Sequence, residues 1–254
     1  MTQSLLKTTL LPACIAAIVS GAAVYGGLTL LQQNPGTGGA EFEASVHDYL
    51  VTHPQILMEM QTALLQQRDA EEQAARHAAL TSVGMDALVD PMVAYVEGPA
   101  DAKVTVAEFF DYRCGFCKAT LPAIKAVVAA HPEVRFAFIE YPILTQDSLV
   151  AAHAAVAARK QPGLYLPFHL ALMETQGELP LERILSIAES VGLNVEQLQA
   201  DMSDPSVLAS LEASRALAES LHVGGTPSFV INGKFTAGQM TEEELASQIA
   251  EANG

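Results

Sequence analysis

The stretch Phe109–Cys117, FFDYRCGFC, decides the fold of this chain. It joins the end of an apolar run, Val104–Phe110, to two cysteines with two residues between them. Two cysteines at this spacing can close as a disulfide or open to a dithiol, so they can store and pass two electrons. Because Cys14 is the only other cysteine, the pair is not half of a four-cysteine zinc site. We therefore expect a redox-active pair.

The two cysteines are expected to differ. Cys114 is predicted at the amino-terminal end of a helix, where unpaired N–H groups and the helix dipole stabilise a thiolate and lower its pKa. Cys114 is then the attacking sulfur, and Cys117, one turn further in, resolves the mixed disulfide. The alternative is a structural disulfide that never turns over, which gains little stability by closing so short a loop. Arg113 and Lys118 flank the pair and either add positive potential or lie in solvent, and Asp111 and Tyr112 are expected at its rim.

Composition limits the partners. The chain has 254 residues, 50% of them hydrophobic, and a net charge of −16. That length and hydrophobic content allow a sizeable core. The negative charge disfavours binding to nucleic acid and to anionic membrane surfaces.

The first 31 residues are predicted to be a signal anchor. Lys7 precedes an uncharged, mostly apolar stretch, Thr8–Leu31, which is long enough to span a bilayer as a helix. The alternative is a cleaved signal peptide with its cleavage site near Ser20–Ala22 and a soluble periplasmic product. Either interpretation exports the rest of the chain to a compartment where disulfides persist, the periplasm or its equivalent.

A tether and a helical extension are predicted next. Residues 32–40 are polar and rich in turn residues, which favours a linker. Residues 41–88 have helical periodicity, interrupted at His53-Pro54. The apolar stripe of this extension requires a partner, which is either its own domain or copies of itself, in a homo-oligomer formed through residues 41–80.

The remaining residues, 89–254, alternate between strand and helix patterns, which predicts an α/β domain. The βαβ rule makes the strands on either side of the helix after Cys117 parallel. Helical segments fill residues 148–222, and Asn232-Gly233 predicts a hairpin. The expected strands are Met92–Glu97, Val104–Phe110, Val134–Tyr141, Pro227–Ile231 and Lys234–Ala237, with helices at Lys118–Ala130 and after Thr241.

This order of elements resembles the thioredoxin fold of the DsbA family, with a helical insertion at about 147–222. The resemblance covers residues 89–254. Three separated features match it in the right order: the Cys114-Gly-Phe-Cys117 motif, Glu108 six residues before the first cysteine, and Gly225-Thr226-Pro227 before a strand. The helical extension before the domain is similar to that of ScsC-like and DsbC-like variants of the family.

The resemblance implies roles for further residues. Glu108 would be a buried acid that accepts or returns the proton of Cys117; its alternative is a side chain that alternation turns to solvent. Thr226 and Pro227 would form a cis peptide facing the disulfide and would pair with an extended substrate; the alternative is an ordinary trans proline. Gly115 would let the substrate backbone approach, and Phe116 would offer it an apolar surface or simply pack.

The implied function is that of an exported protein thiol–disulfide oxidoreductase, with protein substrates, a membrane redox partner and neither cofactor nor metal. The helical extension, Gly115-Phe116 and Thr226 resemble ScsC-like proteins, which places isomerase or reductase work ahead of oxidase work. The DsbA-like core is the argument for an oxidase. The alternative from another class is a non-catalytic module, either a chaperone-like holder of unfolded chains or a Cu(I) carrier, since two thiolates can bind Cu(I).

Overall fold

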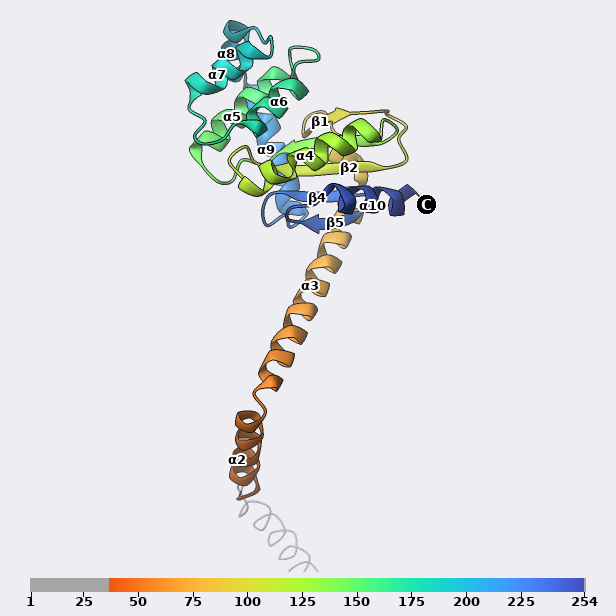
Figure 1. The fold of residues 1–254 in the computed structure, drawn as a ribbon, viewed down its shortest axis with the longest axis vertical. Helices are drawn as coiled ribbons and strands as arrows, with labels where there is room; N and C mark the ends of the chain where they lie inside the picture. Colours follow the sequence, from red (N-terminus) through yellow and green to blue (C-terminus); the bar gives the residue numbers. More distant parts are fainter. Residues whose placement is uncertain (1–36, 254) are drawn as a thin grey trace, which may run out of the picture. The chain divides into compact units, whose positions relative to one another are not determined.

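The computed structural model describes residues 37–253, which belong to two compact units, residues 1–68 and residues 69–254 (Figure 1). The predicted signal anchor of residues 1–31 lies outside the described residues. Within residues 37–253, none of the helices combines the length and the apolar character that a membrane span requires.

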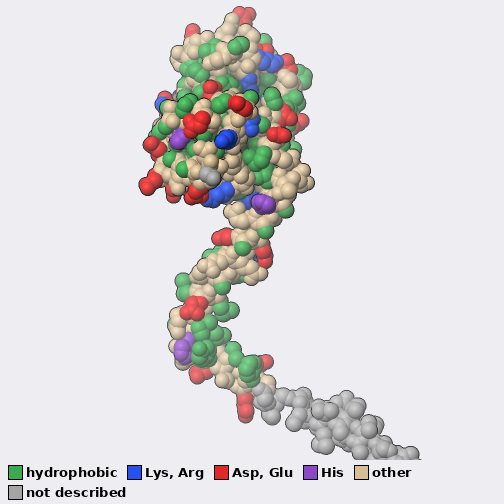
Figure 2. All heavy atoms as spheres, turned by 90° about the vertical axis from the view of Figure 1, so that its right-hand side faces the viewer, with side chains coloured by type: hydrophobic (Ala, Val, Ile, Leu, Met, Phe, Trp, Pro, Cys, Tyr) green, Lys and Arg blue, Asp and Glu red, His purple; other side chains and the backbone are tan. Residues whose placement is uncertain are grey.

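The first unit is helical from Thr37 onward. Helix α2 is Thr37–Thr52, and helix α3, Gln55–Val83, begins directly after the predicted break at His53-Pro54. Residues 37–40, which were expected in the linker, are already helical, so that part of the prediction is wrong. Large apolar side chains of this unit are exposed, as the green atoms of Figure 2 illustrate; they include Phe42 at 69% and Leu57 at 70% exposure.

The predicted boundary at residues 88 and 89 falls too late. The second unit begins at Asp69, within α3. Ala79 packs against the core of this unit and Leu80 is buried in it, together with Leu88 of the short 3-10 helix η1, Met85–Val89. The end of the expected extension is therefore part of the second unit, because its apolar side chains are needed to cover the sheet.

The centre of the second unit is a five-stranded mixed sheet of order β1-β3-β2-β4-β5 (Figure 1). Strands β2 and β3 pair in parallel, as the βαβ rule predicts, and the other neighbours pair antiparallel. Asn232 and Gly233 have φ of 45° and 93°, the left-handed values of a tight hairpin turn between β4 and β5. The strands are β1 Ala94–Glu97, β2 Thr105–Phe110, β3 Arg135–Glu140, β4 Ser228–Ile231 and β5 Lys234–Ala237.

Strand alternation divides the core into two layers. Val106 and Phe110 of β2 pack into one core with α4, Gly115–Ala130, and α10, Glu242–Asn253. Ala107 and Phe109 point to the other face, which the end of α3, η1 and α9 cover. Because Glu108 lies between Ala107 and Phe109, its side chain points to the face that α4 covers.

Five helices between β3 and β4 occupy the place of the predicted insertion. The breaks between them fall where glycine or proline interrupts the helical pattern, such as Gly177 and Asp204-Pro205. Helix α5 packs against α6, α7, α8 and α9, so the insertion has a core of its own that continues into the core of the sheet. The helices are α5 Gln146–Ala158, α6 Tyr165–Glu174, α7 Leu181–Ser190, α8 Val195–Met202 and α9 Pro205–Ser220.

Candidate active site

Cys114 is the N-cap residue of α4. Its backbone is extended, with φ −75° and ψ 115°, and its sulfur accepts a hydrogen bond from the N–H of Cys117 at 3.4 Å. The first N–H groups of a helix have no partner within the helix, so a sulfur at this position receives them. The predicted placement of Cys114 at the start of a helix is confirmed.

The two thiols are free, and their pKa values move in opposite directions. A hydrogen bond from the Cys117 side chain, another from the Thr226 side chain, and the N–H groups of Cys117 and Phe116 lower the pKa of Cys114 to about 5, against the effect of burial. The same contact with Cys114, burial and the nearby Glu108 raise the pKa of Cys117 well above its ordinary value. At neutral pH the geometry holds a thiolate on Cys114 and a proton on Cys117.

Thr226-Pro227 is a cis peptide, as predicted. It directly precedes β4 and brings the carbonyl oxygen of Thr226 to 3.1 Å from the Cys114 sulfur. Gly225 lies on the same loop, where its carbonyl oxygen accepts a hydrogen bond from Ser228 Oγ at 2.7 Å. The loop thus lies opposite the amino terminus of α4, and the structure brings Cys114, Cys117, Thr226 and Pro227 together.

Gly115 and Phe116 form the exposed first turn of α4. No atom lies within 4 Å of the position that a Cβ would take at Gly115, so packing within this chain does not require glycine there. The Phe116 side chain is 65% exposed, which excludes the alternative that it packs in the core. An apolar ring therefore faces solvent beside the reactive sulfur.

Glu108 is buried at 4% exposure in the centre of the sheet, between Phe138 of β3 and Phe229 of β4. The alternative of a solvent-facing side chain is wrong. Burial, and secondarily the charge on Cys114, raise the pKa of Glu108 to about 8. A carboxyl with that pKa, whose charge interacts with both thiols, can take up and release a proton near neutral pH.

Asp111 was expected at the rim and is instead 1% exposed. Its carboxylate accepts hydrogen bonds from the N–H groups of Arg113, Ile143 and Leu144 and from Ser148 Oγ. Its carbonyl oxygen accepts the N–H of Cys114 at 3.0 Å. Asp111 thus ties the cysteine loop to the segment after β3, a role that depends on a distant loop and left no signal in the local sequence.

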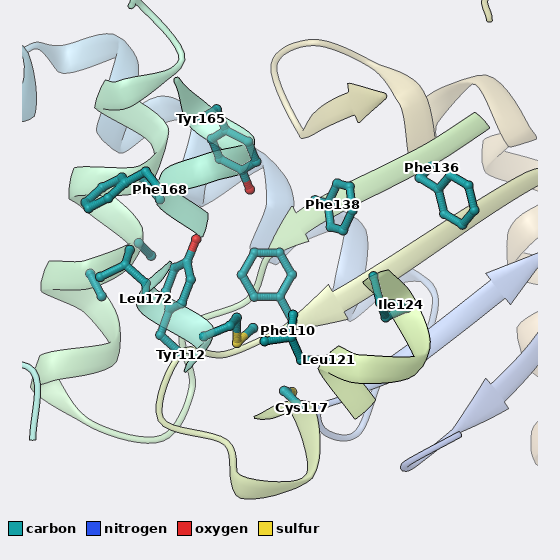
Figure 3. Close-up of a cluster of buried hydrophobic side chains, with 14 of the residues drawn as sticks. Phe110, Tyr112, Cys117, Leu121, Ile124, Phe136, Phe138, Tyr165, Phe168 and Leu172 are labelled. Atoms are coloured by element: carbon teal, nitrogen blue, oxygen red, sulfur yellow. The ribbon is translucent and has the colours of Figure 1, made fainter. Parts of the chain in front are cut away.

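Tyr112 is likewise buried, not at the rim. Its hydroxyl donates to Glu140 Oε1 at 3.0 Å, and Tyr165 of α6 donates to the same oxygen at 3.0 Å. The two hydroxyls point toward one another in the close-up of the core (Figure 3). Tyr112 has one proton and donates it to Glu140, so the 3.1 Å contact with His169 Nδ1 requires a proton on that nitrogen.

His169 is a core residue, 1% exposed. Burial, and then the charge on Arg159, lower its pKa to about 3, so it is neutral. Glu140, at the end of β3, was missed in the sequence. A single acid at the end of an apolar strand, with tyrosines elsewhere in the chain, was the signal available.

Comparisons with known proteins identify the family. A model described as the DSBA-like thioredoxin domain matches residues 105–250, more than half of the chain. The chain belongs to the DsbA-like thioredoxin family. A second model, the copper resistance protein ScsC N-terminal domain, matches residues 40–72. Both parts of the predicted resemblance, the DsbA-type core and the ScsC-like extension, are confirmed.

Solved structures agree with this assignment. A thioredoxin-like oxidoreductase from Silicibacter pomeroyi is 42% identical, with a TM-score of 0.63, and the match covers 67% of this chain and 98% of that one. BcfH from Salmonella enterica Typhimurium is 27% identical, with a TM-score of 0.70, and the match covers 96% of this chain and 100% of that one. The chain's family is DsbA-like, and one of these solved structures is described as an oxidoreductase. Both findings agree with the prediction of an enzyme that exchanges thiols and disulfides.

One curated relative is much longer. The Na(+)/H(+) antiporter NhaA 1 of Salinispora arenicola is 30% identical over 166 residues, which are 65% of this chain and 25% of the antiporter. This DsbA-like chain therefore spans about a quarter of the length of that curated relative.

Proposed function

We propose that this chain is an exported thiol–disulfide oxidoreductase that exchanges disulfides with protein substrates through Cys114 and Cys117. One observation carries the proposal: the Cys114 sulfur caps the amino terminus of α4 and accepts the N–H of Cys117 at 3.4 Å, and in this position the pKa of Cys114 is lowered to about 5 while that of Cys117 is raised. A structural disulfide has no use for such a difference. A nucleophile with a protonated resolving partner requires it.

In the first step the Cys114 thiolate attacks a substrate disulfide. A bond forms between the Cys114 sulfur and one substrate sulfur, the substrate S–S bond breaks, and the other substrate sulfur leaves as a thiolate. An extended substrate chain pairs with the backbone at Thr226, as an added strand does, and its apolar side chains contact Phe116. In the reverse direction a substrate thiolate attacks the Cys114–Cys117 disulfide.

In the second step Cys117 resolves the mixed disulfide. Its proton passes to Glu108, its sulfur attacks the Cys114 sulfur, and the remaining substrate sulfur leaves as a thiolate. The pair is oxidised to a disulfide and the substrate is reduced by two electrons. Glu108 serves as the base because its pKa, about 8, allows it to gain and lose a proton near neutral pH.

We favour isomerase or reductase activity over oxidase activity. The match of residues 40–72 to the ScsC N-terminal domain supports it, and so do the exposed apolar side chains of the first unit, which suit association of copies through residues 41–80. We also propose that the chain is exported, that residues 1–31 anchor it to a membrane, and that it has a membrane redox partner. These three points are supported by the sequence and the family resemblance alone.

The test is thiol turnover with matched cysteine variants. The wild-type protein is expected to reduce insulin disulfides and to refold scrambled ribonuclease, C114S to do neither, and C117S to accumulate a mixed disulfide with the substrate. A redox titration of the pair and the mass of the soluble portion decide direction: a monomer with a strongly oxidising potential would overturn the preference for isomerase.

A Cu(I) carrier is the second candidate, because the two sulfurs are in hydrogen-bond contact and the N-terminal match bears a copper-resistance description. The raised pKa of Cys117 opposes it, since a metal ligand must lose its proton. Tight Cu(I) binding by a protein without thiol turnover would favour the carrier.

A further inference from the structure

Lys118, the residue after Cys117, is fixed between α4 and the end of α6. Its Nζ lies 2.7 Å from the carbonyl oxygen of Thr175, 3.1 Å from that of Met173 and 3.3 Å from that of Leu172. An ammonium group has three donors, and each has a carbonyl acceptor here. Lys118 was expected either to add positive potential at the cysteine pair or to lie in solvent. Its three hydrogen bonds show that it connects α4 to the end of α6.

Two more cations bind the same turn. Arg113 Nη1 donates to the carbonyl oxygen of Gly177, and Arg183 Nη1 donates to those of Gln176 and Glu178 at 2.9 Å each. The carbonyl end of a helix has negative partial charge, which favours the Lys118 ammonium at the end of α6, and the two arginines bind carbonyls of the segment that follows it. Residues 172–178 thus receive both cations that flank the cysteine pair.

The charge on Lys118 also interacts with Cys117. Burial, Arg113 and Arg183 lower the pKa of Lys118 to about 8, while Cys117 and Asp111 act in the opposite direction. The other charged groups beside it, Lys125 of α4 and Glu174 of α6, pair with one another at 2.7 Å. Cys117, once it loses its proton, and Asp111 are therefore the groups whose negative charge favours the protonated form of Lys118.

We propose that Lys118 is a positioning residue for the resolving step: it fastens the first turn of α4 to the end of α6 and stabilises the negative charge that forms on Cys117. This inference rests on the proposed function. When Cys117 gives its proton to Glu108 and attacks the Cys114 sulfur, the Cys114–Cys117 bond forms and the bond from Cys114 to the substrate sulfur breaks. A protonated Lys118 lowers the energy of the Cys117 thiolate before the attack.

The proposal predicts a bell-shaped pH dependence for resolution. The rate rises with pH as Glu108 loses its proton and becomes a base, and it falls with pH as Lys118 loses its charge. Arginine stays protonated throughout this range. In K118R the rising limb stays and the falling limb moves to higher pH; in E108Q the rising limb is lost.

The experiment is a single-turnover measurement on the full chain. The reduced protein is mixed with a peptide carrying an activated disulfide, quenched with acid, and the mixed disulfide and released peptide are quantified by mass spectrometry. K118M is expected to slow resolution about tenfold, the size of one lost interaction with a charged group. K118R should stay within about threefold of wild type at pH 7, as expected when the charge is kept. K125M, which removes the neighbouring exposed lysine of α4, is the control and should match wild type.

The outcomes are distinct. If K118M resolves at the wild-type rate, or if the falling limb stays in place in K118R, the role of Lys118 is overturned. If K118M does not fold, the pH profile of K118R decides alone. The C117S variant tests the proposed function separately, because it should trap the mixed disulfide. If neither C117S nor the wild-type protein forms a mixed disulfide, the proposed function fails, and the inference about Lys118 fails with it.

Discussion

Two regions of the second unit hold the same side chain in similar burial and give it different neighbours. Glu108 on β2 and Glu140 on β3 are 4% and 1% exposed, and burial is the main cause that raises the pKa of each to about 8. Around Glu108 lie Cys114 and Cys117, which we call the Glu108 site. Around Glu140 lie the residues of the Glu140 site, Tyr112, Tyr165 and His169.

The difference teaches that a shifted pKa alone does not identify a reactive group. Glu140 accepts two tyrosine hydroxyls on its Oε1 and interacts with the charge of Arg159, so its site links the sheet to the insertion. Glu108 is instead near two sulfurs of which one must lose a proton during exchange. Neighbours that change charge in the proposed reaction, rather than burial, are the reason to propose Glu108 and not Glu140 as the base.

The largest expected effect is at the Glu108 site itself. C114S should lose thiol exchange down to the background of the assay, because a hydroxyl is not ionised at neutral pH and cannot replace a thiolate nucleophile. Insulin reduction measures it. Y112F, in the Glu140 site, is the comparison and should keep most of the activity; equal loss in both would mean that the two sites work as one.

The next effect separates the two carboxyls. E108Q removes the proposed base and should slow resolution by roughly 10², the lower range for loss of general base catalysis. The resolution rate of E140Q should stay within about threefold of the wild-type rate, because the Glu140 site does not touch the sulfurs. Single-turnover rates at pH 7 measure both. Equal slowing would contradict the distinction drawn between the sites.

For stability, in contrast to activity, a change in the Glu140 site should have a larger effect than a change in the Glu108 site. Y112F removes a hydroxyl that Glu140 accepts at 3.0 Å, and the loss should lower the free energy of unfolding by about 1–3 kcal/mol. E108L removes a buried acid that the fold must hold without benefit to stability, so it should be neutral or stabilising. Urea unfolding at pH 7 compares them, and a strongly destabilised E108L would give Glu108 a structural role.

The pH dependence of stability follows from the raised carboxyl pKa values. Between the ordinary value of 4.5 and about 8, the folded protein holds a proton on Glu140 that the unfolded chain has lost. The free energy of unfolding should therefore fall as pH rises through this interval, by up to about 1.4 kcal/mol per pH unit for each such group. Unfolding of the disulfide form, in which Cys114 does not titrate, should show this slope, and E140Q should reduce it by the contribution of one group, leaving that of Glu108. An unchanged slope in E140Q would contradict the raised pKa of Glu140.

The smallest effect is at Thr226. T226V removes a hydroxyl that helps lower the pKa of Cys114 but leaves the larger contribution from Cys117. The pKa of Cys114, measured from the pH dependence of alkylation, should rise by about one unit. T236V, a hydroxyl on β5 that hydrogen bonds Gln248, is the matched control and should leave that pKa unchanged.

Local patterns predicted the parts of this protein that depend on neighbours in the chain. The parallel pairing of β2 and β3, the helix at Cys114 and the Asn232-Gly233 hairpin follow from periodicity, the βαβ rule and turn chemistry. The cysteine spacing, Glu108 and Thr226-Pro227 carried the family resemblance from which the site residues were predicted, and the roles of those residues stay predictions. These signals are local because backbone geometry is set within a few residues.

Only the tertiary structure decided which polar side chains are buried and what they contact. Asp111 and Tyr112 look like rim residues in the sequence, yet a distant loop and α6 cover them. Lys118 finds its carbonyl acceptors more than fifty residues away, and Glu140 finds Tyr165 twenty-five residues away. The sequence by itself determined the reactive pair and the fold that carries it, whereas the charges around that pair depend on packing between segments that no local pattern relates.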